Sequence, residues 1–363
     1  MSVPEGVPAR SAAPPAAGKD SFPNVGVSLR FLRRIRDDPR LQQPVCSLPF
    51  VSASGEFGPV GTLVCAREPA ELTLGQLRSL AQEYRVFSDL DGGDEFGRYT
   101  GTIHLDRDEW LAALRLPPRS TSQVCVVIVK VDTLAAGQCY AEMLRSRGGI
   151  EAADVGVPTV FLSHAWRYSF TNLVDAVDAH YEVQQPAVRD AAFVWNDIFV
   201  EDQNSSASKP PDYFFNAFKD AVGAIGHTVL VLEPWSAPIP LTRAWCIWEI
   251  YSTITTGATL TVAHSPAENA SFENALVENF ESLSLSLSDV DAERAGAFSA
   301  SDKQRIDATI KAELSGGFDA INELVVERMR TWLVRAGQAA VDALRTRCDK
   351  TCSSCCCLHL WLF

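Results

Sequence analysis

The sequence predicts an α/β protein built on an open parallel sheet with helices on both faces. Four apolar runs between residues 157 and 264 alternate with segments of helical periodicity. These runs are continuously apolar, which is typical of strands covered on both faces. Their alternation with helices favours parallel strands joined by right-handed crossovers. Hydrophobic residues make up 47% of the 363 residues, enough to bury a substantial core.

The expected strands and helices follow one another in a regular order. The strands are VPTVFLSHAW at 157–166, AAFVWNDIF at 191–199, HTVLVLEPW at 227–235 and ATLTVAH at 258–264. Helices are expected between them at 170–180, 214–225 and 242–254. Thr242 is the expected N-cap of the last of these. An amphipathic helix is expected further on, at 318–334.

The composition divides the chain into four parts. Residues 1–44 are rich in proline, alanine and charge, and we expect them to be disordered. Residues 45–150 are expected to form a small α+β region, with helices at 75–87 and 109–114 and a buried strand in VCVVIVKV at 124–131. Residues 157–335 form the α/β domain with a helical extension, and residues 336–363 are a cysteine-rich tail.

One segment of the N-terminal half resembles a calcium-binding loop. The stretch DLDGGDEFGRYTGTIHLDRDEW at 89–110 places Asp89 and Asp91 like the first two ligands of an EF-hand. Extra residues displace Glu109 from the twelfth position, where a bidentate ligand is needed. We therefore expect a degenerate helix–loop–helix, and no metal site.

Charge and cysteine usage limit the partners and the compartment. The net charge of −13 and pI near 5.0 disfavour nucleic acid and anionic lipid as main partners. The chain has no apolar stretch of the roughly 20 residues that span a bilayer and no secretory signal. Residues 1–40 have some features of a transit peptide, but their acidic residues count against one. We expect a cytoplasmic protein with free thiols.

The tail CDKTCSSCCCLHLWLF leaves several alternatives open. Cys355, Cys356 and Cys357 stand beside an apolar end, a pattern that suits S-acylation and reversible membrane association. Metal binding by clustered cysteines and His359 is a weaker alternative, because a flexible triple-cysteine run gives poor tetrahedral geometry. An unstructured tail without a role is equally consistent with the composition.

Polar and aromatic residues gather where the expected strands end. In open α/β sheets, ligands bind at the carboxyl ends of the strands. Helix 242–254 adds a Trp, a Cys and a Glu near one helical face. A glutamate on a tryptophan-lined face is a candidate for a desolvated carboxyl group with a shifted pKa. The residues at the three strand ends are Ser163, His164 and Trp166; Trp195, Asn196 and Asp197; and Glu233 and Trp235.

Four segments carry a family resemblance. VFLSHAW, VWNDIF, TVLVLEPW and TRAWCIWEI, in this order, resemble the strands and the W-C-x-x-E-[LI] helix of the Toll/interleukin receptor (TIR) family. The match covers about 157–265. The helical stretch at 302–333 resembles the extension of a TIR-like subgroup found in large algal and oomycete proteins. The resemblance implies a flavodoxin-like sheet.

The resemblance also implies an activity, cleavage of NAD at the nicotinamide–ribose bond. Glu249 would be the catalytic carboxylate, because a carboxylate beside the ribose stabilises an oxocarbenium-like transition state. NAD would be a substrate and not a held cofactor, since neither GxGxxG nor GxxxxGK[ST] is present. Trp195 could also stack on a base. The expected substrate contacts are Ser163, His164, Trp166, Arg167, Asp197, Phe199, Arg243, Trp245 and Cys246.

Other interpretations of these residues remain open. The domain could be a non-catalytic signalling module that self-associates, or an enzyme acting on another N-glycosidic bond; a homo-oligomer is expected in either case. Glu249 could be a solvated residue or pair with Arg243, and Asp197 could be a turn former. At least two of Trp195, Trp235, Trp245 and Trp248 are expected in the core. The long polar loop at 200–214 and the proline-rich 234–244 depart from the family pattern.

Overall fold

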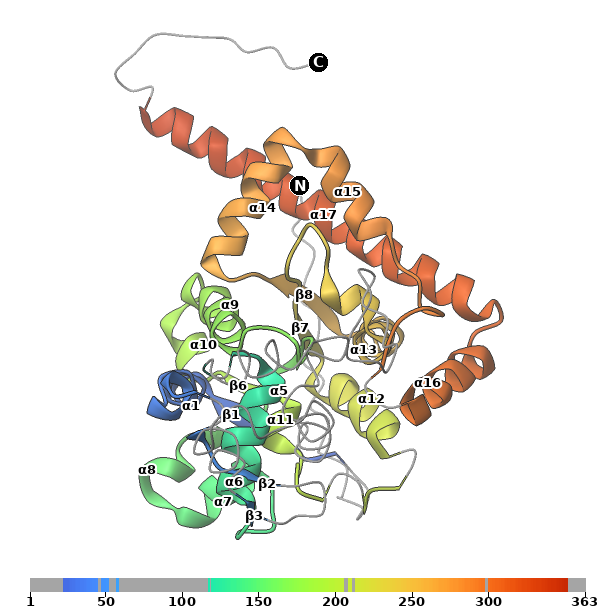
Figure 1. Cartoon of the computed structure of the whole chain (residues 1–363). Helices are drawn as coiled ribbons and strands as arrows, with labels where there is room; N and C mark the ends of the chain where they lie inside the picture. Colours follow the sequence, from blue (N-terminus) through green and yellow to red (C-terminus); the bar gives the residue numbers. More distant parts are fainter. Residues whose placement is uncertain are drawn as a thin grey trace, which may run out of the picture.

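The computed structural model describes residues 22–44, 47–51, 57–58, 117, 119–205, 208–210, 213–297 and 300–351. Within these ranges the centre of the molecule is a six-stranded sheet in the order β4-β1-β6-β5-β7-β8 (Figure 1). A separate antiparallel pair joins β2 (Phe50–Val51) to β3 (Phe57–Gly58). The strands of the large sheet are β4 (Val155–Gly156), β1 (Gly26–Ser28), β6 (Phe193–Trp195), β5 (Val160–Ser163), β7 (His227–Val231) and β8 (Thr259–Ala263).

The sheet is mixed, and this corrects the expectation of a wholly parallel one. The four expected strands are all present and pair in parallel, β6 with β5, β5 with β7 and β7 with β8. The antiparallel part comes from β1, which pairs with both β4 and β6. The chain passes from β5 outward to β6 and then returns across β5 to β7. The connections that leave the carboxyl end of β5 and of its neighbours therefore diverge there.

Both faces of the sheet are covered, as the continuous apolar strands predict. Val229 and Val231 of β7 belong to one apolar cluster, whereas Leu230 and Leu232 belong to another. This alternation is the period of two that a strand imposes on its side chains. The helices between the strands also agree with expectation. They are α9 (Phe170–Glu182), α12 (Tyr213–Ile225) and α13 (Ala244–Thr256), with the short α10 (Pro186–Asp190) after α9.

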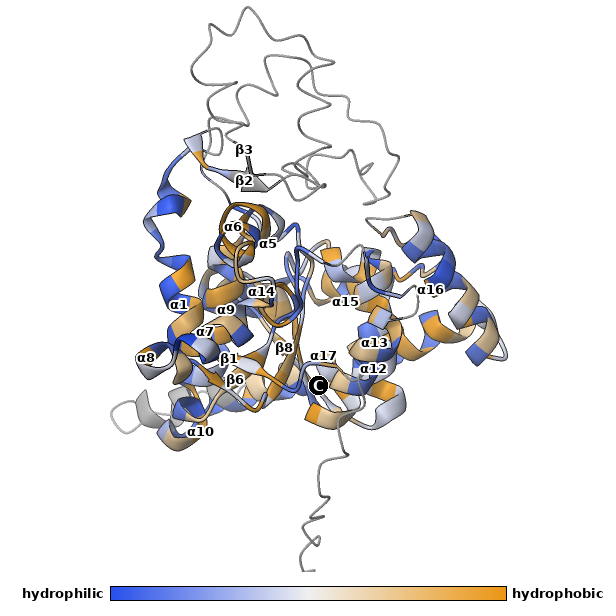
Figure 2. Cartoon of the chain, turned by 90° about the horizontal axis from the view of Figure 1, so that it is seen from below, coloured by the Kyte–Doolittle hydropathy of each residue, from blue (hydrophilic) through white to orange (hydrophobic). Residues whose placement is uncertain are grey.

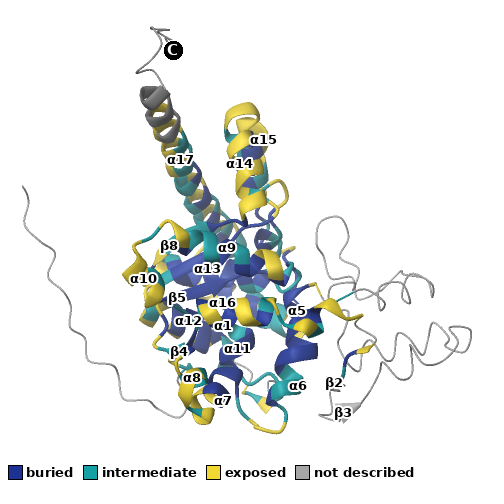
Figure 3. Ribbon diagram, turned by 90° about the vertical axis from the view of Figure 1, so that its left-hand side faces the viewer, coloured by how far each residue is buried: buried dark blue, intermediate teal, exposed yellow. Residues whose placement is uncertain are grey.

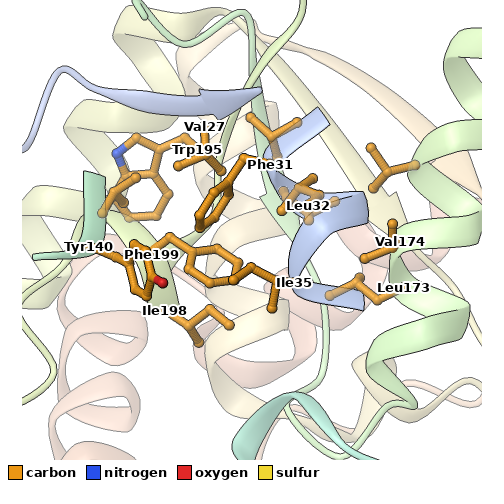
Figure 4. Packing of buried hydrophobic residues seen from close by; sticks show 14 of the residues in the cluster. Val27, Phe31, Leu32, Ile35, Tyr140, Leu173, Val174, Trp195, Ile198 and Phe199 are labelled. Carbon is orange, nitrogen blue, oxygen red and sulfur yellow. The ribbon is translucent and has the colours of Figure 1, made fainter. Parts of the chain in front are cut away.

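Residues 22–44 are ordered, so the prediction that residues 1–44 are disordered is wrong for this part. Strand β1 leads directly into α1 (Leu29–Arg36), whose first turn is capped by the Ser28 hydroxyl accepting from the Phe31 amide. Phe31, Leu32 and Ile35 are buried at helical spacing against α9 and against Phe199 (Figure 4). Burying these apolar side chains stabilises the segment more than its proline-rich and charged surroundings suggest. A 3-10 turn, η1 (Pro39–Gln42), follows.

The apolar run at 124–131 is helical, which corrects the predicted strand. A capping box between Ser120 and Gln123 starts α5 (Thr121–Val124). The π-helical segment η4 (Cys125–Val129) and α6 (Lys130–Thr133) continue it, and every side chain of η4 is buried. A short run that is buried all round has no periodicity to separate helix from strand. In Figure 2 the orange turns between the labels α5 and α6 belong to η4, whose sequence is CVVIV.

Two further helices complete this region, α7 (Tyr140–Arg147) and α8 (Gly149–Ala152). Tyr140, Met143 and Leu144 of α7 share one core cluster with the sheet. The helices predicted at 75–87 and 109–114 and the EF-hand-like loop at 89–110 lie outside the described residues.

The C-terminal part is helical, as expected. It comprises α14 (Pro266–Glu278), α15 (Phe280–Ser288), α16 (Ala300–Glu313) and α17 (Gly317–Thr351). Ile321, Val325, Met329 and Leu333 form one buried stripe of α17, which confirms the amphipathic prediction for 318–334. Beyond this stripe α17 extends away from the body, and α14 and α15 project beside it (Figure 3). Among the described residues, no helix combines the length and the apolarity needed to cross a membrane. The cysteines proposed for acylation lie outside the described residues.

Candidate active site

A cavity of about 240 Å³ opens at the carboxyl ends of β5 and β6, where the sequence predicts the ligand site. Its wall is built by the loop after β5, by the short helix α11 (Asp197–Val200) and by the first turns of α13. Asn196 caps α11 by accepting from the Ile198 amide at 3.2 Å, so the strand expected over 191–199 ends at Trp195. This early turn carries Asp197 into the cavity wall.

Glu249 lies in this wall on α13 and is almost completely buried, with 7% of its surface exposed. The Ser163 hydroxyl, at the end of β5, donates a hydrogen bond of 2.5 Å to Glu249 Oε2. Burial raises the pKa of Glu249 well above its usual value, the Ser163 hydrogen bond opposes this, and the charge of Asp197 adds to it. Burial of the Glu249 carboxyl group therefore favours its protonated, uncharged form.

Asp197 is fixed by two donors on the side of the cavity. The Trp166 indole N–H donates to Asp197 Oδ2 at 2.8 Å, and the Ile198 amide donates to Oδ1 at 2.9 Å. Burial raises the pKa of Asp197, and these hydrogen bonds together with the charge of His164 oppose the rise. Trp166 is thus oriented edge-on to the carboxyl group, and Asp197 does more than form a turn.

His164 is a buried imidazole beside these carboxyl groups. Burial lowers its pKa, and Asp197 opposes that effect. Its Nε2 has no hydrogen-bond partner among the described residues, although the side chain lines the cavity. Its backbone carbonyl accepts from the Cys246 thiol at 3.4 Å, which ties the loop after β5 to α13. Burial also raises the pKa of Cys246, so this thiol is not an activated nucleophile.

Most of the residues expected to contact substrate are brought together. Ser163 stands directly behind Glu249 and contacts the cavity only through that residue. Thr242 is not the N-cap of α13. It ends the proline-rich 3-10 turn η6 (Ile239–Thr242), and Arg243 takes the N-cap position. The predicted residues that line the cavity are His164, Trp166, Arg167, Asp197, Arg243, Trp245, Cys246 and Glu249.

Phe199 is not a substrate contact, and this expectation is corrected. Its ring is fully buried and packs edge-on against Phe31, with 5.0 Å between ring centroids, and near Tyr140 and Phe170 (Figure 4). The turn at Asn196 rotates residue 199 away from the cavity and into the core. Trp195 is also fully buried and stacks on Phe161 with 4.8 Å between ring centroids, and it lines the cavity from this position in the core.

Sequence reasoning missed several residues of the cavity. Glu201 follows α11 and is 3% exposed, and the Tyr213 hydroxyl donates to its carboxylate at 3.2 Å. Burial raises the pKa of Glu201 to about 7. Its place four residues after Asp197 was the signal that could have found it. The other missed residues come from the helical 120–133 segment, the polar loop and α16, and they are Ser122, Cys125, Val126, Lys130, Gln203 and Asp302.

The long polar loop after β6 is part of the site. Glu201 and Gln203 line the cavity, and the Asn204 amide donates to the Lys130 carbonyl and the Thr133 hydroxyl, both at 3.0 Å. The loop and the helical 120–133 segment therefore support each other. Across the described part of the chain, no cluster of His, Cys, Asp and Glu suits a metal ion.

The chemistry of the cavity combines acids, bases and aromatic surface. Four carboxyl groups and three cationic side chains share it with the rings of Trp166 and Trp245. Such a site can stack a planar ring and stabilise a positive charge that develops inside it. Comparison of the chain with protein-family models, with curated proteins and with solved structures finds no significant match.

Proposed function

We propose that this cavity binds the nicotinamide–ribose part of NAD and that the chain hydrolyses the bond between nicotinamide and ribose. The observation that carries the proposal is Glu249, a buried carboxyl group in the cavity wall that is bonded to Ser163 at 2.5 Å. Three of the four segments that resemble the TIR family, VFLSHAW, VWNDIF and TRAWCIWEI, contribute residues to the cavity wall. The order β6-β5-β7-β8 supports the same interpretation, because it is the order of a flavodoxin-like sheet around its first strand.

The raised pKa of Glu249 fits a substrate that brings its own positive charge. The nicotinamide ring of NAD is cationic, and a cation close to a carboxyl group lowers the pKa of that group. Binding would therefore ionise Glu249 in place. The carboxylate would then stabilise the ribosyl cation as neutral nicotinamide departs, without any need for a strong acid. Burial makes this stabilisation larger than it would be in water.

The remaining parts of NAD have candidate contacts at the same cavity. Trp166 and Trp245 offer aromatic surface, and Arg167 and Arg243 offer guanidinium groups for the pyrophosphate. A cavity of about 240 Å³ is small beside the roughly 300–1,000 Å³ of typical ligand pockets. We infer that it takes the nicotinamide riboside end, with the rest of the dinucleotide at its mouth.

A second candidate function is a non-catalytic module that self-associates. The observation in its favour is the burial of Glu249, which raises the pKa of its carboxyl group, since such a group can simply be part of a packed interior. Exposed Phe280 and Leu285 on α15 and Val334 on α17 offer apolar contacts for a second copy. A homo-oligomer, cytoplasmic placement and membrane association through Cys355, Cys356 and Cys357 remain expectations under either function.

The test is nicotinamide release from NAD by purified protein, compared with Glu249→Gln. Gln keeps the shape and accepts a hydrogen bond from Ser163, but it cannot ionise. We expect release by the wild type and a loss of about 10²-fold or more in the variant, the size found when one electrostatic stabiliser is removed. Glu233→Gln is the matched control, because Glu233 is equally buried and does not line the cavity. Equal release by wild type and Glu249→Gln would contradict the assignment. No release by crowded wild-type protein would favour the self-associating module.

A further inference from the structure

The cavity holds a second buried carboxylate whose position suits a different step of the reaction. Glu201 is 3% exposed and lines the cavity together with Glu249, but it comes from another element, the end of α11. The charge of Asp197 raises the pKa of both carboxyl groups, so the two belong to one electrostatic environment. Hydrolysis needs a group that stabilises the cation and a group that activates water, and one carboxylate cannot serve both at once.

We propose that Glu201 is the general base that takes the proton of the attacking water, with Tyr213 as its positioning residue. This inference rests on the proposed function. The Tyr213 hydroxyl is within 3.2 Å of both carboxylate oxygens, which fixes the carboxylate plane against the start of α12. Asp197 already accepts from two separate donors, the Trp166 indole and the Ile198 amide, one on each oxygen. The Tyr213 hydroxyl has a single proton to donate, which leaves lone pairs of Glu201 for a water. Glu249 faces Ser163.

The step is balanced without another reagent. Nicotinamide leaves with the electron pair of the C1′–N bond and becomes neutral. The water oxygen donates an electron pair to C1′ and forms the C1′–O bond, while one of its protons moves to the carboxylate of Glu201. The product is ADP-ribose, and Glu201 later returns its proton to solvent.

The surroundings of Glu201 fit a base that works near neutral pH. Burial raises its pKa to about 7; Lys209 and the Tyr213 hydroxyl oppose the rise, and Asp197 and Asp202 add to it. A base is most effective when its pKa lies near the working pH. Lys209 lies over the Tyr213 ring, with its Nζ 4.3 Å from the centroid, and so belongs to the same cluster. From α7, Cys139 and Glu142 also act on this cluster.

Glu201→Gln separates this role from a structural one by measuring two reactions of the same protein. Hydrolysis is followed as ADP-ribose formation, and reversible cleavage is followed as exchange of labelled nicotinamide into NAD. We expect hydrolysis to fall by about 10²-fold or more, while exchange persists because it needs no water. Glu278→Gln is the control, since this acid at the end of α14 is exposed and does not line the cavity. Glu201→Ala with added formate should recover hydrolysis, as a small carboxylate can replace the lost base.

The outcomes are distinguishable from failure of the proposed function. If Glu201→Gln lowers hydrolysis and exchange in equal proportion, or lowers neither, Glu201 is not the base. The same conclusion follows if formate restores nothing. Wild-type protein that neither hydrolyses NAD nor exchanges nicotinamide would overturn the proposed function itself, and the role of Glu201 with it, before any variant is made.

Discussion

Two buried carboxyl groups in this molecule have pKa values shifted in opposite directions. Asp154, beside the antiparallel edge of the sheet, is fully buried and accepts hydrogen bonds from Ser28 at 2.6 Å, Arg30 at 2.8 Å and Arg34 at 2.7 Å. Burial acts to raise its pKa, but these hydrogen bonds and the Arg34 charge outweigh burial and hold the pKa below its usual value. Glu249, at the carboxyl end of β5, is also buried, yet burial prevails and its pKa rises.

The difference separates a carboxylate that holds the fold together from one that is available for chemistry. The charge of Asp154 is neutralised within the fold, where it joins β4, β1 and α1. Ionisation of Glu249 becomes favourable only when a ligand brings a compensating positive charge into the cavity. Buried groups with raised pKa values gather at functional sites for this reason. The comparison therefore supports the proposal that the chemistry takes place at the carboxyl ends of β5 and β6.

The largest expected effect on stability is at Asp154. Asp154→Asn removes the charge that pairs with two arginines, and we expect the free energy of unfolding at pH 7 to fall by about 2 kcal/mol. This is below the roughly 3–5 kcal/mol for breaking a fully buried pair, because Arg30 and Arg34 are 57% and 43% exposed and can be hydrated. Urea unfolding measures the change. An unchanged midpoint would show that Asp154 is not a structural link.

The stabilising effect of Asp154 should depend on pH in a definite direction. Because folding lowers the pKa of Asp154, its contribution to stability is present above the unfolded value of 3.8 and disappears as pH falls through the folded pKa. The stability gap between wild type and Asp154→Asn should therefore close in acid. A gap that stays constant down to the lowest accessible pH would contradict an electrostatic origin.

Glu249→Gln should have a smaller effect of opposite direction. Folding raises the pKa of Glu249, so wild-type stability from this group is greatest below the unfolded value of 4.5 and declines as pH rises toward the folded pKa. Gln has no such decline. We expect the variant to be more stable than wild type by on the order of 1 kcal/mol at pH 7, with the gain vanishing near pH 4.5. Urea unfolding across this range measures it, and a variant that is less stable at every pH would show that Glu249 is ionised in the fold.

Ser163→Ala should give the smallest change. The Ser163 hydroxyl stabilises the carboxylate form of Glu249, so its removal raises the pKa of Glu249 further. The rising limb of nicotinamide release against pH should move upward by at most about one pH unit, since one hydrogen bond contributes about 0.5–1.5 kcal/mol. Ser252→Ala, also buried on α13 but outside the cavity, is the control. If the rising limb of the pH profile does not move, Ser163 does not influence the ionisation of Glu249.

The sequence predicted the parallel half of the sheet and failed at its antiparallel edge. The four parallel strands lie in continuous apolar runs of the sequence, and their alternation with helices leaves little choice of topology. Strand β1 is only three residues long and gains its stability from distant partners, because Val27 pairs with Val155 and with Val194. No local pattern reports such contacts. The run at 124–131 failed for another reason, since a segment buried on every side looks alike as helix or strand.

The location of the candidate site was predicted better than the full set of residues that line it. Strand ends and the helical spacing of Trp245, Cys246 and Glu249 brought eight lining residues together. Phe199 was misplaced because the strand was expected to continue to residue 199, whereas α11 already begins at Asp197. Glu201 was missed because its importance comes from burial against Tyr213, a contact across a polar loop. Periodicity locates a side chain on an element, but burial by a distant segment decides its chemistry.

The most direct test of the central claim is nicotinamide release from NAD by wild type and Glu249→Gln, measured from acid to alkaline pH. Because ionised Glu249 is the form that stabilises the ribosyl cation, wild-type kcat/KM should rise with pH along a limb that lies above the usual pKa of 4.5 for a glutamate. The Gln variant should show neither the activity nor the limb. An active Gln variant with the wild-type profile would contradict the assignment of Glu249 and, with it, this account of the site.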